Sequence, residues 1–173
     1  MNLDNTKWLA RHLNLAAEIS RWSKDNSTKV GALIVTKEGK PVSWGYNGIP
    51  MGVRETMDRD IKPEKYHYYA HAERNALDLS RSSVGGCWLF VTHPPCSDCA
   101  RGIIQTGIST VVIDTNGIDE FAMRDNWSES AEHALTMFNE ANIKVIYFDP
   151  IKHHRVEHAL ARRITKKENI ECS

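Results

Sequence analysis

The residues of this sequence best suited to chemistry are His71 and Glu73, followed by Cys96 and Cys99. One imidazole and two thiolates form a three-ligand set for zinc, which keeps its fourth position for water and lowers the pKa of that water towards about 7. The Cys-x-x-Cys spacing lets both sulfurs reach one ion at the start of a helix, where free N–H groups and the helix dipole favour thiolate. The sequence therefore predicts one zinc ion (Zn²⁺) per chain, bound by His71, Cys96 and Cys99.

Glu73 follows His71 by two residues, and we predict that it is the catalytic acid and base. Helical residues step by about 100°, so Glu73 points about 200° away from His71 and does not ligate the same ion. In the first helical turn it can instead lie beside the metal site and move protons. H-x-E followed by P-C-x-x-C is the signature of zinc-dependent nucleobase deaminases. A structural zinc knuckle would need a fourth ligand, for which only Cys87 or His93 lies near, and a redox Cys pair would not need H-x-E.

Composition limits the classes of protein that this chain can represent. Its 173 residues include 22 basic and 22 acidic side chains, so the formal net charge is zero. The chain therefore has no overall electrostatic attraction for nucleic acid or membranes. We expect one domain over residues 1–173, with a core at about 5–150 and a helical extension at about 151–173. No apolar run approaches the roughly 20 residues of a membrane span, and no signal peptide or disulfide framework is visible. These features predict a cytoplasmic protein, or one of the host cytoplasm if the chain is viral.

Hydrophobic periodicity predicts the elements that position these side chains. Residues 5–24 read as an amphipathic helix, and residues 30–35 and 41–48 read as two strands of a hairpin. After His71 the pattern alternates between helices at 71–79, 97–106 and 128–141 and strands at 87–92, 110–114 and 144–148. Such alternation favours right-handed crossovers and parallel pairing. The expected fold is α/β, with an N-terminal antiparallel hairpin followed by a parallel βαβαβ unit.

Three irregular segments remain. Residues 51–69 carry charges of both signs and lead directly to His71, so we predict a flap beside the substrate. The connector 115–127 should lie on the same sheet edge as the metal-binding loop, because the carboxyl ends of parallel strands share one edge. The basic segment 152–167 is predicted to be a solvated helix and not a nucleic-acid patch.

With these motifs placed, the chain resembles the cytidine and deoxycytidylate deaminase superfamily over residues 8–147. Residues 23–32 (SKDNSTKVGA) resemble the segment that leads into the family's first strand. Residues 45–52 (GYNGIPMG) resemble its nucleotide-binding G-Y-N-G-x-P-x-G run and narrow the match to the deoxycytidylate branch. The resemblance implies a three-layer α/β/α fold with a five-stranded mixed sheet, and a homo-oligomer.

The resemblance also implies an activity: zinc-dependent deamination of dCMP to dUMP and ammonia, with dCTP and 5-substituted dCMP as further candidate substrates. It makes Asn47 a contact to the deoxyribose and Ala72 another substrate-binding position. Lys29, Arg54 and Arg124 are candidates for the 5′-phosphate, because each offers a charge-assisted hydrogen bond. A tRNA or polynucleotide base deaminase and a non-catalytic zinc module are the alternatives. The resemblance also makes dCTP and dTTP candidate allosteric effectors, because such control is common in the family.

Overall fold

The computed structural model describes residues 5–116 and 125–155. Its centre is a mixed sheet with the strand order β2-β1-β3-β4-β5-β6. The strands are β1 (Gly31–Val35), β2 (Pro41–Tyr46), β3 (Trp88–Val91), β4 (Thr110–Asp114), β5 (Lys144–Asp149) and β6 (His154–Arg155). β1 pairs antiparallel with β2 and with β3, whereas β3, β4 and β5 are mutually parallel. The predicted hairpin and parallel unit are both confirmed.

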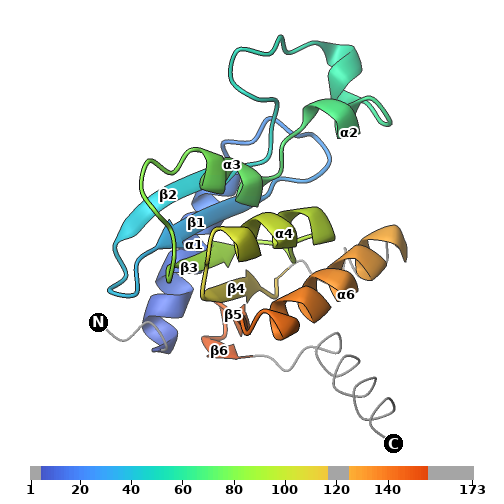
Figure 1. Ribbon diagram of the computed structural model, residues 1–173. Coiled ribbons are helices and arrows are strands. Elements are labelled where there is room, and N and C mark those ends of the chain that lie inside the picture. Colours follow the sequence, from blue (N-terminus) through green and yellow to red (C-terminus); the bar gives the residue numbers. More distant parts are fainter. Residues whose placement is uncertain (1–4, 117–124, 156–173) are drawn as a thin grey trace, which may run out of the picture.

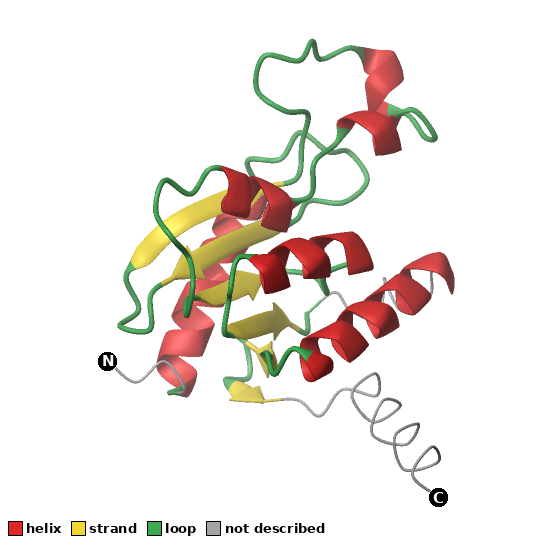
Figure 2. Cartoon of the chain, in the orientation of Figure 1, coloured by secondary structure: helices red, strands yellow, loops and turns green. Residues whose placement is uncertain are grey.

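Helices cover both faces of this sheet (Figures 1 and 2). α1 (Thr6–Ser20) packs on one face against alternate strand residues such as Leu33, Phe90 and Val112. α3 (Ala72–Asp78), α4 (Ser97–Gln105) and α6 (Asp125–Glu140) pack on the other face, where Ile34 and Leu89 point. The three-layer α/β/α arrangement is therefore confirmed. Within the described part of the chain, no helix is long and apolar enough to cross a membrane.

The two largest differences from the predicted helix and strand limits are at helix ends. The N-cap of α1 is Asn5, whose Oδ1 accepts a hydrogen bond from Lys7 N at 3.0 Å, and the helix ends at Ser20, four residues before the predicted end. α6 begins at Asp125, before the predicted start. The predicted connector at 115–127 includes residues 117–124, and the predicted domain at 1–173 also includes residues 156–173. Both of these ranges lie outside the described residues. These two assignments stay predictions.

The sixth strand corrects two expectations, five strands in the sheet and a helix that starts at about residue 151. Oδ1 of Asp149 accepts hydrogen bonds from Ile151 N and Lys152 N at 2.8 and 2.9 Å, so the chain turns immediately after β5. His153 follows in the left-handed region at φ 55°. This turn brings β6 back antiparallel against the end of β5. A side-chain-capped turn of this kind leaves no hydrophobic periodicity for sequence reasoning to find.

The flap, residues 51–69, contains the short helices η1 (Met57–Asp60) and α2 (Lys65–Tyr68). Figure 1 shows it extending beyond the sheet near the end of β2, above α3. An antiparallel bridge between Gly48 and Ala70 closes its base, with N–H to carbonyl distances of 3.1 and 2.9 Å. The flap therefore returns the chain to His71 directly beside the G-Y-N-G run.

Candidate metal centre

His71 is the N-cap residue of α3, and its backbone is extended at φ −74° and ψ 157°. The position of α3 depends on β2, which lies unusually close to it at Gly45. A Cβ atom at Gly45 would overlap the backbone of Ala72 and Ala76. Ser43 Oγ also donates to Ala76 O at 2.7 Å from the same strand. Close packing against β2 thus fixes the helix that carries His71 and Glu73.

Cys96 and Cys99 lie at the start of α4, as predicted. Cys96 is the N-cap residue, and its Sγ accepts a hydrogen bond from Cys99 N at 3.5 Å. Both thiols are buried. Pro94 and Pro95 precede them and have no backbone N–H to donate to a neighbouring strand, so the chain leaves the sheet before the helix begins. The spacing thereby places both sulfurs at the positive end of a helix dipole.

The structure brings the three predicted ligands together in one His-Cys-Cys group (His71, Cys96 and Cys99). His71 Nδ1 lies 3.4 Å from Cys96 Sγ and 3.3 Å from Cys99 Sγ. A tetrahedral zinc ion with Zn–S of about 2.3 Å and Zn–N of about 2.0 Å would separate these atoms by about 3.5 Å, so the group fits zinc. Neither Cys87 nor His93 joins the group within the described residues. Three protein ligands leave the fourth zinc position open for water, as in a catalytic site, whereas a structural site would be closed by a fourth protein ligand.

The three side chains also adjust one another's protonation. The hydrogen bond with Cys96 raises the pKa of His71 to about 9, although burial opposes the rise. The Cys99 thiol and the His71 ring hold the pKa of Cys96 near 4, while that of Cys99 is raised by the same shared hydrogen bond and by burial. The pair of thiols thus readily holds one negative charge, which suits a thiolate ligand.

Glu73 lies beside the His-Cys-Cys group without belonging to it. It is 3% exposed, in the first turn of α3. Burial raises the pKa of its carboxyl to about 7, while the charge on His71 and a hydrogen bond with Cys99 act in the opposite direction. A carboxyl group with a pKa near neutrality can both accept and donate a proton. Its location is therefore the one expected for a proton carrier next to a metal.

Asn47 is buried, and other protein groups occupy its side-chain amide. Nδ2 donates to Asp25 Oδ2 and to Thr28 O, each at 2.8 Å, while Oδ1 accepts from Val30 N at 2.8 Å. Both N–H bonds are used, which leaves the second lone pair of Oδ1 for a sugar hydroxyl. In the structure, Asn47 holds the backbone on both sides of Lys29.

The other predicted substrate contacts lie in different settings. Lys29 is exposed two residues before β1, and Arg54 is exposed in the flap. Ala72 is fully buried at the start of α3. Arg124 lies outside the described residues. The phosphate-binding roles of Lys29, Arg54 and Arg124 stay predictions.

Sequence reasoning missed one buried ion pair near these residues, between Lys65 of the flap and Asp25. Asp25 could have been recognised from the sequence, because an Asp side chain commonly accepts hydrogen bonds from the backbone N–H groups two and three residues further along the chain and so caps a turn. Lys65 had none, since a lysine in a charged flap is indistinguishable by pattern from a solvated one.

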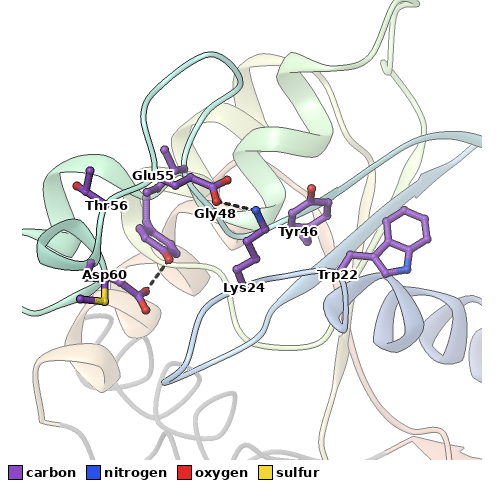
Figure 3. A pocket seen from close by; sticks show the side chains of 10 residues that line it. Trp22, Lys24, Tyr46, Gly48, Glu55, Thr56 and Asp60 are labelled. Atoms are coloured by element: carbon purple, nitrogen blue, oxygen red, sulfur yellow. Dashed lines mark hydrogen bonds and ion pairs between the residues drawn. The ribbon is translucent and has the colours of Figure 1, made fainter.

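A cavity of about 320 Å³ lies between the end of α1, the residues after β2 and the flap (Figure 3). Trp22 and Tyr46 form an aromatic part of its lining. Lys24 and Glu55 make an ion pair across it at 2.6 Å, and the Tyr69 hydroxyl donates to Asp60 at 2.6 Å. No member of the His-Cys-Cys group lines this cavity. The cavity is therefore separate from the metal centre, although Tyr69 lies only two residues before His71.

An α/β/α fold with a His-Cys-Cys group and an adjoining buried carboxyl defines a zinc-dependent deaminase site. Residues 6–115 match the sequence model described as the cytidine and deoxycytidylate deaminase zinc-binding region, and the chain belongs to this family.

Relatives support this assignment. A deaminase of Aliivibrio fischeri, named only by its position in the luxG 3′ region, is 40% identical over 82% of this chain and 94% of its own length. The deoxycytidylate deaminase of Homo sapiens is 34% identical over 85% of this chain and 83% of its own. The dCMP deaminase of cyanophage S-TIM5, solved in complex with dCMP and dUMP, is 27% identical with a TM-score of 0.60, over 80% of this chain and 94% of that one.

Proposed function

We propose that this protein catalyses the hydrolytic deamination of dCMP to dUMP and ammonia. The observation that carries the proposal is the His-Cys-Cys group, with His71 Nδ1 at 3.4 and 3.3 Å from the two sulfurs, next to the buried Glu73. A structural metal site would not need that carboxyl group. Similarity to proteins named deoxycytidylate deaminase supports the choice of nucleotide.

His71, Cys96 and Cys99 would hold the zinc ion. Bound there, zinc would lower the pKa of a water molecule towards about 7 and so supply hydroxide for addition to C4 of the pyrimidine. Glu73 takes the proton that the water loses and delivers it to N3. It then carries the remaining hydroxyl proton to the amino group, the C4–N bond breaks, and ammonia leaves the uracil ring. Positioned proton transfer of this kind contributes a factor of about 10² to 10⁴ in rate.

The phosphate and sugar contacts decide the preferred substrate. Lys29 and Arg54 place positive charge on segments that flank the G-Y-N-G run, and Asn47 offers a free lone pair to a sugar hydroxyl. Arg124 and Ala72 are further candidate contacts. A charge-assisted hydrogen bond is worth about 1.5 to 3 kcal/mol, or about ten- to over a hundredfold in selectivity for the nucleotide over the nucleoside. We therefore expect a strong preference for dCMP over deoxycytidine, cytidine and CMP.

Ammonia release tests this function. Initial rates are measured with dCMP, dCTP, 5-substituted dCMP, deoxycytidine, cytidine, CMP and a short RNA that contains cytidine and adenosine. The expected result is the highest kcat/KM for dCMP. Equal kcat/KM for dCMP and deoxycytidine would exclude a phosphate site, and a preference for RNA would indicate a polynucleotide base deaminase. No turnover of any substrate by zinc-loaded protein would favour a non-catalytic zinc module.

Four properties accompany this proposal. We infer one zinc per chain, which elemental analysis measures. We also infer a homo-oligomer, since Tyr66 in the flap is 66% exposed and a monomer leaves its ring in water. Sedimentation as a monomer at micromolar concentration would contradict this. Regulation by dCTP or dTTP is tested by adding each to the dCMP assay, and the cytoplasmic location stays a prediction.

A further inference from the structure

The most deeply buried ion pair in the described residues joins the flap to the loop before β1, residues 23–30. Lys65 Nζ donates to Asp25 Oδ1 at 2.5 Å and to Ser27 Oγ at 2.6 Å. The two charged side chains are 9% and 3% exposed. The other ion pairs of the described residues have at least one strongly exposed partner. Removing one member of a buried pair leaves an uncompensated charge, so this contact couples its two segments strongly.

On the flap side, the pair fixes the segment that leads to the metal ligand. Lys65 lies in α2, and its ammonium group also lies 5.0 Å from the centre of the Tyr69 ring. Tyr69 lines the cavity and donates to Asp60, and the chain continues through Ala70 to His71. Two exposed contacts, Lys24 to Glu55 and Asn26 to Asp60, lie beside the buried pair. They connect the same two segments but are open to solvent and so contribute less.

On the other side, Asp25 fixes the loop that carries the proposed phosphate contact, Lys29, and binds the proposed sugar contact, Asn47. Its carboxylate accepts hydrogen bonds from Ser27 N at 2.7 Å, from Thr28 N at 3.0 Å and from Asn47 Nδ2 at 2.8 Å. Asn47 in turn holds Thr28 O and Val30 N, on either side of Lys29. One carboxylate therefore connects the flap, the Asn47 amide and the backbone of Lys29.

We propose that Lys65 and Asp25 are positioning residues for nucleotide binding: their buried ion pair holds the flap closed against the loop 23–30 and fixes Asn47 and Lys29 in their binding orientation. The proposal rests on the proposed function, because it assigns the pair to the substrate site of that reaction. Lys65 and Asp25 bind no metal and carry no proton in the reaction. Their loss should consequently weaken substrate binding more than the chemical step.

The test compares Lys65→Met, Asp25→Asn and the double variant with wild type. Lys65→Met keeps the apolar stem of the side chain, and the double variant removes both charges, so that no unpaired charge stays buried. Arg21→Met is the matched control, because it breaks the exposed ion pair with Glu18 at the end of α1. Three quantities are measured for each protein: zinc content, KM and kcat for dCMP, and the rate of trypsin cleavage after Arg54 and Arg59 in the flap.

For Lys65→Met we expect full zinc content, a KM raised by about tenfold or more, and flap cleavage faster by about tenfold or more, since a broken buried pair is strongly destabilising. The kcat should stay within about threefold of wild type, because the groups that carry out the reaction remain in place. The double variant should have a KM above wild type but no higher than Lys65→Met. Arg21→Met should match wild type within about twofold, since exposed ion pairs contribute little.

An unchanged KM would overturn the proposal even if the flap is cleaved faster, because the pair would then be structural only. An unchanged cleavage rate would overturn it as well. If Lys65→Met does not fold, the double variant decides by the same two measurements. If wild type does not turn over dCMP, the proposed function fails, and flap cleavage in the variants alone then supports or overturns the anchoring role.

Discussion

Replacing Gly45 with alanine tests how the metal centre is positioned. Gly45 lies in β2, where the strand runs against the start of α3. An added Cβ would lie 2.9 Å from the carbonyl carbon of Asn75 and still closer to the backbone atoms of Ala72 and Ala76. All three neighbours are backbone atoms of the helix that carries Glu73, so no flexible side chain can move aside.

The size of the effect follows from this geometry. Ordinary contacts of a Cβ atom begin at 3.4 Å, so α3 must move away from β2. The shorter approaches require a displacement of about 1 Å before the attractive contact distance is restored. A misplacement of about 1 Å can reduce turnover about a hundredfold. Overpacking costs about 1 to 3 kcal/mol, which lowers the melting temperature by about 2 to 12 °C for a chain of this size.

The assay measures kcat for dCMP, zinc content and the thermal unfolding midpoint of Gly45→Ala. Gly85→Ala is the control, because its Cβ would meet Ser83 Oγ at 3.6 Å and Thr106 O at 3.9 Å, both ordinary contacts. We expect wild-type behaviour from the control and a large loss of kcat from Gly45→Ala. If Gly45→Ala keeps wild-type kcat and an unchanged midpoint, the close approach of β2 does not position α3, and the reasoning is refuted.

Three further predictions follow from the site and the loop before β1. Glu73→Gln should keep its zinc and its fold but lose nearly all turnover of dCMP; loss of zinc would instead make Glu73 a ligand. A chelator should abolish activity, and added Zn²⁺ should restore it to protein that holds one ion per chain by elemental analysis. Burial by itself raises the pKa of Asp25, but the Lys65 ammonium group and the N–H groups of Ser27 and Thr28 together lower it below its ordinary value of 3.8. The stability that Asp25 contributes is thus complete above about pH 4 and is lost as the pH falls through the lowered folded-state pKa. Urea unfolding between pH 5 and pH 2 should show this loss in wild type and a flatter dependence in Asp25→Asn.

The sequence by itself determined the local geometry of the metal centre. The spacing of Cys96 and Cys99, together with the two prolines before Cys96, requires both thiols to lie at a helix start, independently of the rest of the fold. The alternation of apolar segments likewise determined the parallel unit from β3 to β5, because crossovers of that length permit little else. The first inference depends on neighbours within a few residues, where backbone geometry is decisive, and the second depends on the order and length of consecutive segments along the chain.

Only the tertiary structure decided which distant groups meet. Lys65 is separated from Asp25 by 40 residues. It is buried because the loop 23–30 closes over it, and no local pattern records this. Asn47 was predicted as a sugar contact, yet its N–H groups are occupied by Asp25 and Thr28, which depends on how the hairpin meets that loop. The physical reason is that spacing along the chain fixes which face a side chain occupies. Which distant residue that side chain contacts is set instead by how whole helices, strands and loops pack together, and this packing is the sum of many weak contacts spread over the chain.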